Sequence, residues 1–323
     1  MNIRKSIHFS FVIAVFSCST PSNNVSSVST GYHSESAAVV QGVSMLGDTL
    51  ISKIDSTTQD EQIRRLQEAE KKYSEEPSME NLIWIGRREA YLGRHDLAIR
   101  TFTKAIKEYP EAFEPLRHRG HRLVSVRKFD QAIEDFEKAV ILMEGKELII
   151  EEDGMPNKLN IPLSNIQFNV WYHLGLAHYL KGDWGKALEA YTECLKVSDN
   201  DDLMVATLDW YYMTLMKMGK IAEAIEAIAV VTPNMTIIEN DAYYKRIMMY
   251  KGQVAPENLL NVDANEQDQR LQYVTQGYGL GNYYLTKGDT LQAEKIFQNV
   301  LDTGYWSAFG YIASEMELAK LKE

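Results

Sequence analysis

The chain has 323 residues and a formal net charge of -11, with 45% hydrophobic and 24% charged residues, a balance that is typical of a globular protein. Its 19 glycines and 8 prolines are few for this length, which favours long helices over a many-turned β-protein. Two cysteines exclude a disulfide framework or a four-cysteine zinc site, and the acidic balance argues against nucleic-acid binding, which needs a basic face.

The first residues have the pattern of an export signal, which we assign to residues 1–17. Arg4 and Lys5 precede an apolar stretch, Ile7 to Phe16, that is too short to span a membrane. The stretch runs into Cys18 and resembles the signal of bacterial lipoproteins. That resemblance implies cleavage before Cys18, lipid on its sulfur, and a protein held in the cell envelope, facing the periplasm from the outer membrane, by this anchor only. The alternative is an ordinary signal peptide with a chance cysteine.

Residues 18–57 are predicted to form a flexible tether, because the stretch from Ser19 to Ser36 is rich in Ser, Asn and Thr and has no periodicity. After it, Thr58 and Glu61 have the spacing of a capping box that opens the first helix.

From here the chain repeats one motif. Gly86, Ala98, Phe102 and Ala105 recur 34 residues later as the set Gly120, Ala132, Phe136 and Ala139. Further copies contain the sets Gly175, Ala187, Tyr191, Cys194 and Gly281, Ala293, Phe297, Val300. The small residues let two helices approach closely, and the aromatic residues fill the space between hairpins. This pattern resembles the tetratricopeptide repeat, whose helical hairpins must stack because one hairpin cannot bury its own apolar face.

The resemblance implies an all-α fold over residues 58–323: a right-handed α-solenoid of about six helical hairpins with a C-terminal capping helix, predicted from Trp306 to Lys322. Turn motifs such as Leu92-Gly93-Arg94 mark the middle of each hairpin, although the second hairpin has Arg127-Lys128 and no glycine. The fifth hairpin is predicted to have a short second helix near Pro256. The chain order also resembles a group of bacterial repeat proteins, through stretches such as Trp84-Ile85-Gly86-Arg87-Arg88, from which no activity carries over.

An insertion interrupts the repeats at residues 144–165, between the second and third hairpins, where the spacing of successive turns lengthens to 55 residues. Asp153-Gly154 is a turn signal between two possible short strands. The insertion is either a flap docked over the groove, with its acids against basic residues, or a disordered loop.

In tetratricopeptide arrays the first helix of each hairpin lines a concave groove. Carried onto this chain, the resemblance predicts a basic mouth followed by an aromatic floor, which suits an extended peptide with an acidic group. The alternative is that the arginines pair with nearby acids as a solvated face. The predicted groove residues are Arg87, Arg117, His121, Tyr172, Tyr179, Asp209, Met213, Arg246, Tyr278 and Asn282.

The function predicted from the sequence is therefore a protein-interaction scaffold or adaptor in the bacterial cell envelope, whose partner is a protein or peptide. The alternative is a glycan- or small-ligand-binding lipoprotein, because 18 tyrosines and 5 tryptophans could stack on sugars. No catalytic or phosphate-binding motif is present, so we expect no enzyme, no metal and no cofactor. Gly277-Tyr278-Gly279-Leu280-Gly281 lacks a preceding strand and is predicted to serve close helix packing, as Cys194 is.

Overall fold

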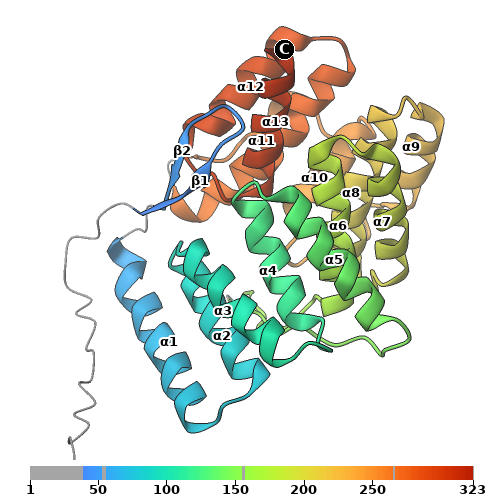
Figure 1. The fold of residues 1–323 in the computed structure, drawn as a ribbon. Helices are drawn as coiled ribbons and strands as arrows, with labels where there is room; N and C mark the ends of the chain where they lie inside the picture. Colours follow the sequence, from blue (N-terminus) through green and yellow to red (C-terminus); the bar gives the residue numbers. More distant parts are fainter. Residues whose placement is uncertain (1–38, 53–55, 155–156, 265, 323) are drawn as a thin grey trace, which may run out of the picture. The chain divides into compact units, whose positions relative to one another are not determined.

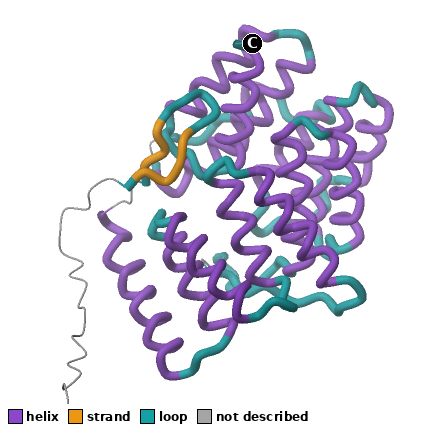
Figure 2. Tube along the Cα trace, viewed as in Figure 1, coloured by secondary structure: helices purple, strands orange, loops and turns teal. Residues whose placement is uncertain are grey.

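The computed structural model describes residues 39–52, 56–154, 157–264 and 266–322. The predicted signal peptide, residues 1–17, and Cys18 lie outside the described residues. Figure 1 shows the chain as a succession of helices, and Figure 2 shows strands in one short segment only.

Helices dominate the part of the chain that is described, which confirms the all-α solenoid. Six hairpins follow α1, with a final helix after them, and their bounds in chain order are α1 Ser56–Glu75; α2 Met79–Tyr91 with α3 His95–Glu108; α4 Glu114–Ser125 with α5 Phe129–Met143; α6 Ile166–Lys181 with α7 Trp184–Lys196; α8 Asp201–Lys217 with α9 Ile221–Ala227; α10 Asp241–Tyr250; α11 Gln267–Thr286 with α12 Thr290–Asp302; and α13 Phe309–Leu321. A 3₁₀ turn, η1 Ile228–Val230, follows α9.

Two predicted details of these elements are confirmed and two are shifted. The fifth hairpin, begun by α10, has only the 3₁₀ turn η2 Pro256–Asn258 as its second helix, as predicted. The insertion at 144–165 fills the interval between α5 and α6. Thr58 lies inside α1 rather than capping it, because the helix already begins at Ser56. The closing helix α13 begins at Phe309, three residues later than predicted.

Polar side chains cap several helices. Ser78, Asn165 and Asn200 each accept a hydrogen bond from the backbone N–H three residues on, at 3.2, 2.7 and 3.0 Å. Each bond satisfies one of the backbone donors that a helix start leaves unpaired, which stabilises the helix by about 1 kcal/mol.

The turn without glycine keeps the geometry of the others. Gly93 has a φ of 66°, in the left-handed region, and Arg127 takes the same conformation at the second hairpin with a φ of 64°. A side chain in this region is strained by about 1 kcal/mol or more. Arg127 donates to Glu315 of α13 at 2.7 and 3.2 Å, and both side chains are buried. We infer that this ion pair offsets the strain and is the reason that arginine occupies the turn.

The small residues at the helix crossings act as predicted. A Cβ added at Gly281 would lie 2.3 Å from the Phe297 ring, and one added at Gly175 would lie 2.6 Å from the Tyr191 ring. Both distances are shorter than carbon atoms can approach, so these helices pack at the separation that only glycine permits.

A β-hairpin lies within the predicted tether and corrects that prediction for residues 39–52. Strands β1 Val40–Val43 and β2 Thr49–Ile51 pair antiparallel. The hairpin is anchored at both ends of the array: Asp96 N donates to Gln41 at 3.0 Å, Met45 N donates to Glu315 at 2.7 Å, and Trp306 Nε1 donates to the Ile51 carbonyl at 2.8 Å. The segment is therefore structured, and it links α3 to the C-terminal helix.

Candidate functional site: a basic cluster and the inserted loop

Three arginines come together near the first two hairpins, and we call Arg87, Arg117 and Arg122 the basic cluster. Arg87 lies on α2, and the other two lie on α4. Arg87 places its guanidinium 4.1 Å from the centroid of the Trp84 ring. Arg117 is only 8% exposed, and its Nη1 lies 3.2 Å from His118 Nδ1. The sequence therefore located a concentration of positive charge correctly, and the structure shows it to be largely desolvated.

The inserted loop docks on the basic cluster. Its residue Glu151 is 7% exposed and forms an ion pair with Arg117 Nε at 2.9 Å. Arg87 donates to the Glu152 carbonyl at 2.7 Å, and Arg88 donates to the Gly154 carbonyl at 3.1 Å. Backbone bonds fix the base of the loop, since Glu151 N donates to Ser164 at 2.9 Å. Of the two alternatives for the insertion, the docked flap is confirmed for its described residues.

The fit between loop and array is close. A Cβ added at Gly154 would lie 1.9 Å from the Tyr91 hydroxyl oxygen, so any other residue here would have to displace the Tyr91 side chain or the loop. Asn169 of α6 donates to the Glu151 carboxylate at 3.0 Å. The carboxylate therefore has a charged partner and a neutral one, which is the arrangement that a buried acid needs.

Arg122 has no such partner. It is half-buried, and its guanidinium forms no hydrogen bond or ion pair with the described residues. Burial and the neighbouring Arg117 lower the pKa of Arg122 to about 10. The carboxylates near the cluster are Glu151, which is paired with Arg117, and Asp153, which lies close to Arg87, so three cations face two counter-charges. Partly desolvated charges are costly unless they are paired, so an added anion next to Arg122 would stabilise the cluster.

The histidines beside the cluster are held neutral. Burial, together with the nearby arginines, lowers the pKa of His118, His121 and His173 well below 6.5. The His121 and His173 rings lie 4.4 Å apart, and both pack on Phe309 of α13 at 5.1 and 5.3 Å. They therefore contribute packing rather than charge to this region.

Most of the predicted groove residues are buried, which corrects the expectation of an open groove. Eight of the ten are at most 8% exposed: Arg117, Tyr172, Tyr179, Asp209, Met213, Arg246, Tyr278 and Asn282. Arg87 and His121 alone among the ten keep partial exposure. In this structure the eight have no surface to present to a peptide, so partner binding by them stays a prediction that requires the array to open.

The buried residues bond to one another across non-adjacent helices. Tyr179 of α6 shares a hydrogen bond with Tyr278 of α11 at 2.6 Å. Trp210 of α8 donates to the Tyr172 hydroxyl at 2.7 Å, and that hydroxyl donates to Tyr243 of α10 at 3.0 Å. The first helices of the later hairpins therefore contact one another directly. The aromatic residues that were predicted to line the groove are part of the hydrophobic core instead.

A buried ion pair stands at the centre of this core. Arg246 Nη2 lies 2.8 Å from Asp209 Oδ2, and both side chains are fully buried. Arg246 also donates to the Thr275 carbonyl at 3.1 Å and lies 5.5 to 5.7 Å from three aromatic ring centroids. Burial raises the pKa of Asp209 to about 7, against the opposing effect of Arg246. Since these residues come from different repeats, their pairing was not visible in the sequence.

The remaining sequence motifs serve packing, as predicted. Cys194 is fully buried, and burial raises the pKa of its thiol to about 12, which leaves it unreactive. Within the glycine run, a Cβ at Gly279 would lie 2.2 Å from Arg246 Nε, and one at Gly277 would lie 2.5 Å from Val300. Among the described residues no cluster of His, Cys, Asp and Glu could hold a metal ion, and no helix is long and apolar enough to span a bilayer.

The comparisons with known proteins agree with the repeat pattern. Residues 80–112 and 168–201 each match the tetratricopeptide repeat family. This chain is a tetratricopeptide repeat protein. Such a fold supports a protein–protein interaction scaffold, and proteins of this kind are generally non-enzymatic. No curated protein matches the chain.

Several solved structures resemble this tetratricopeptide repeat protein at low identity. YrrB, described as a TPR protein with an unusual peptide-binding site, is 16% identical with a TM-score of 0.41, and the match covers 73% of this chain and 91% of YrrB. MamA is 18% identical with a TM-score of 0.37 over 68% of this chain and 94% of MamA. A tetratricopeptide repeat protein from Parabacteroides merdae is 12% identical with a TM-score of 0.46 over 82% and 94%. Likenesses of this degree say nothing about what this chain binds.

Proposed function

We propose that this protein is an interaction scaffold of the bacterial cell envelope that binds an acidic segment of a partner protein at the basic cluster. The observation that supports this most directly is Arg122, a half-buried guanidinium without a counter-charge beside the Arg117–Glu151 ion pair. The contact of Glu151 with Arg117 supports the choice of an acidic segment, since Glu151 is itself an acidic side chain at the edge of an extended stretch of the inserted loop. A partner carboxylate would supply the missing anion.

The envelope location rests on the N-terminal sequence. The resemblance of residues 1–18 to a lipoprotein signal implies an anchor at Cys18, and residues 19–38 would then separate the lipid from the β-hairpin. In this proposal the membrane contributes attachment only, and the array provides the recognition surface.

Partner capture tests the proposal. Full-length protein with an affinity tag is crosslinked in intact cells and recovered from envelope fractions, and its partners are quantified by mass spectrometry. Arg122→Gln removes the unpaired cation without breaking any bond of the fold. Because a hydrogen bond to a charged group contributes about 1.5–3 kcal/mol, recovery of the partner should fall by about 10-fold or more. Arg100→Gln, which alters a mostly exposed pair with Asp96, is the matched control and should leave recovery unchanged.

Two further variants sharpen this experiment. Glu151→Gln weakens the hold of the inserted loop on the cluster and should raise partner recovery, because the partner no longer competes with a charged side chain. Cys18→Ala should move the protein from the membrane fraction to the soluble fraction. Equal partner recovery by wild type and Arg122→Gln would refute binding at the cluster, and membrane retention of Cys18→Ala would refute the anchor.

A further inference from the structure

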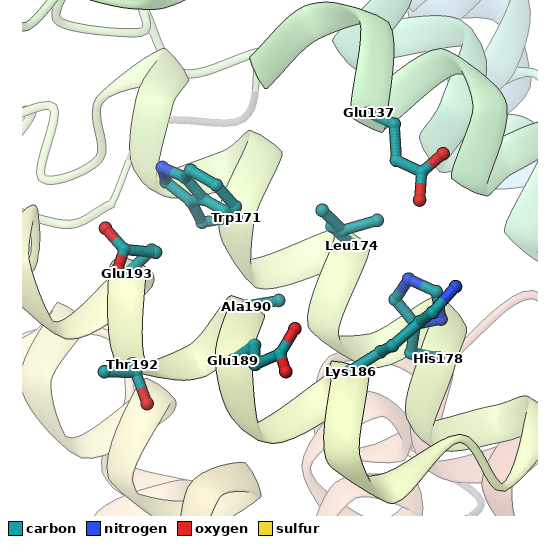
Figure 3. Close-up of a pocket in the computed structure, with 9 residues that line it drawn as sticks. All are labelled: Glu137, Trp171, Leu174, His178, Lys186, Glu189, Ala190, Thr192 and Glu193. Carbon is teal, nitrogen blue, oxygen red and sulfur yellow. The ribbon is translucent and has the colours of Figure 1, made fainter. Parts of the chain in front are cut away.

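A second surface, apart from the basic cluster, is a groove of about 520 Å³ between α5, α6 and α7. Its apolar part is Trp171, Leu174 and Ala190, and carboxylates stand around it at Glu137 of α5 and Glu189 of α7. Figure 3 shows the Trp171 ring on the same side of α6 as Leu174, with Glu137 on the helix opposite. The groove lies between α6, the first helix of the third hairpin, and the second helices α5 and α7, and none of the residues predicted to bind a partner lines it.

The exposure of Trp171 is unusual for its place in the repeat. The residue four positions before the crossing glycine is Leu82 in the first hairpin and Leu116 in the second, and these are 2% and 1% exposed. In the third hairpin the same position is Trp171, which is only half-buried and opens onto the groove. Tryptophan is itself a packing residue of the repeat at this position, and Trp171 packs partly on the core, but its remaining surface faces the groove.

Trp171 also lacks the cation that accompanies every other tryptophan of the chain. Within the described residues the other four indole rings each have an arginine or lysine side chain within 6 Å of the ring centroid, an arrangement that stabilises the cation through the negative face of the ring. These pairs are Arg87 over Trp84 at 4.1 Å, Lys320 over Trp184 at 4.8 Å, Arg246 over Trp210 at 5.7 Å and Arg127 over Trp306 at 5.8 Å. No described cation takes this place at Trp171.

The charges around the groove favour a cation from outside. Glu137 and Glu189 are exposed and form no ion pair with described residues, and Lys186 is the one ammonium that lines the groove. His178 adds no positive charge, because burial and Lys186 lower its pKa. Its buried Nδ1 makes no hydrogen bond, since the nearest acidic oxygen, Asp183 Oδ2, is 3.6 Å away. The groove thus combines a partly exposed indole ring with two carboxylates that have no ion-pair partner among the described residues.

We propose that this groove binds a lysine or arginine side chain on a basic segment of a partner protein, with the cation over the Trp171 ring and within reach of Glu137 and Glu189. The inference does not depend on the function proposed for the basic cluster, because the two surfaces differ in residues and in the sign of their charge. A partner that carries acidic and basic segments could use both.

Indole NMR provides the test. Full-length protein labelled with ¹⁵N-tryptophan shows five indole N–H signals, and Trp171→Phe identifies the one in question. The probe is the blocked peptide acetyl-(Gly-Arg)₄-amide, and the matched peptide contains citrulline, which keeps the shape of arginine without its charge. The arginine peptide should shift the Trp171 signal and leave the Trp184 signal, whose ring already has Lys320, in place. A shift of Trp171 by the citrulline peptide to the same extent would overturn the proposal, as would no shift at all.

Affinity measurements separate the groove from general attraction to an acidic protein. By fluorescence anisotropy with the labelled arginine peptide, Trp171→Leu should weaken binding by about two- to fivefold, the strength of one exposed cation–π contact. Glu137→Gln with Glu189→Gln should weaken it by roughly two- to tenfold. Glu134→Gln on α5, outside the groove, should leave binding unchanged, and so should Arg122→Gln. An equal loss in Glu134→Gln would mean bulk electrostatics and would overturn the proposal.

Discussion

The buried Asp209–Arg246 pair allows a strong test of whether the centre of the array is closed. Both side chains are fully buried and lie 2.8 Å apart. Removing one member of such a pair leaves an uncompensated charge in the core, which destabilises a protein by about 3–5 kcal/mol. Asp209→Leu should reach this full loss, because the remaining guanidinium cannot give up its proton.

Arg246→Met should be less damaging than Asp209→Leu. Burial already raises the pKa of Asp209 to about 7, so its carboxyl can take up a proton near neutral pH when Arg246 is gone. We expect a loss of about 1–3 kcal/mol that shrinks on acidification by at most about 1.4 kcal/mol per pH unit. The Asp209→Leu, Arg246→Met double variant should be more stable than either single variant, since well-packed apolar residues can replace a buried pair at little loss.

Thermal and urea unfolding, followed by circular dichroism at pH 8 and pH 6, measure these losses. At roughly 2–4 °C per kcal/mol, Asp209→Leu should lower the Tm by about 6–20 °C. Lys245→Met, on the same helix α10, removes a pair with Asp241 that is about half exposed and should change stability by less than about 0.5 kcal/mol. If Asp209→Leu is no more damaging than this control, the pair is solvated, and the eight buried groove residues are accessible after all.

Two further predictions concern the histidines and the helix crossings. Burial lowers the pKa of His95 to about 3 and those of His118, His121 and His173 well below 6.5, so only the unfolded chain takes up protons at these sites and stability falls as the pH drops below 6.5. Asp209 opposes this loss, because its raised pKa lets the folded state bind a proton. The net loss of stability from pH 6.5 to 5.5, measured by urea unfolding, should be about 3 kcal/mol. Constant or rising stability over this interval would contradict the assignment of neutral, buried histidines. At the helix crossings, Gly281→Ala should destabilise the protein by about 1–3 kcal/mol, because the added Cβ would lie 2.3 Å from Phe297. The control Gly185→Ala, within α7, has no atom within 4 Å of the added Cβ and should stabilise the protein by up to about 1 kcal/mol. A stabilising Gly281→Ala would refute the packing argument.

The basic cluster shows where reading the sequence succeeded and where it could not. Arg87 and Arg117 were found because repeat offsets place them on one helical face, and the acids of the insertion were expected to meet them. The contact of Glu151 with Arg117 follows from the docking of 22 loop residues, 144–165, which no periodic pattern constrains. The groove at Trp171 was not predicted, because the repeat pattern assigns that residue to helix packing.

By itself, the sequence determined the hairpins of this protein: their number, their order, the crossing glycines and the positions of the turns. It could do so because each repeat packs mainly on its neighbours, and neighbour packing repeats with the period of the chain. Only the tertiary structure decided how far the array closes on itself. Small rotations between successive hairpins add up until α6, α8, α10 and α11 meet, so Tyr179 reaches Tyr278 and Asp209 reaches Arg246. The same closure lets Glu315 reach Arg127 and Met45, contacts that join residues far apart in the chain and leave no periodic trace.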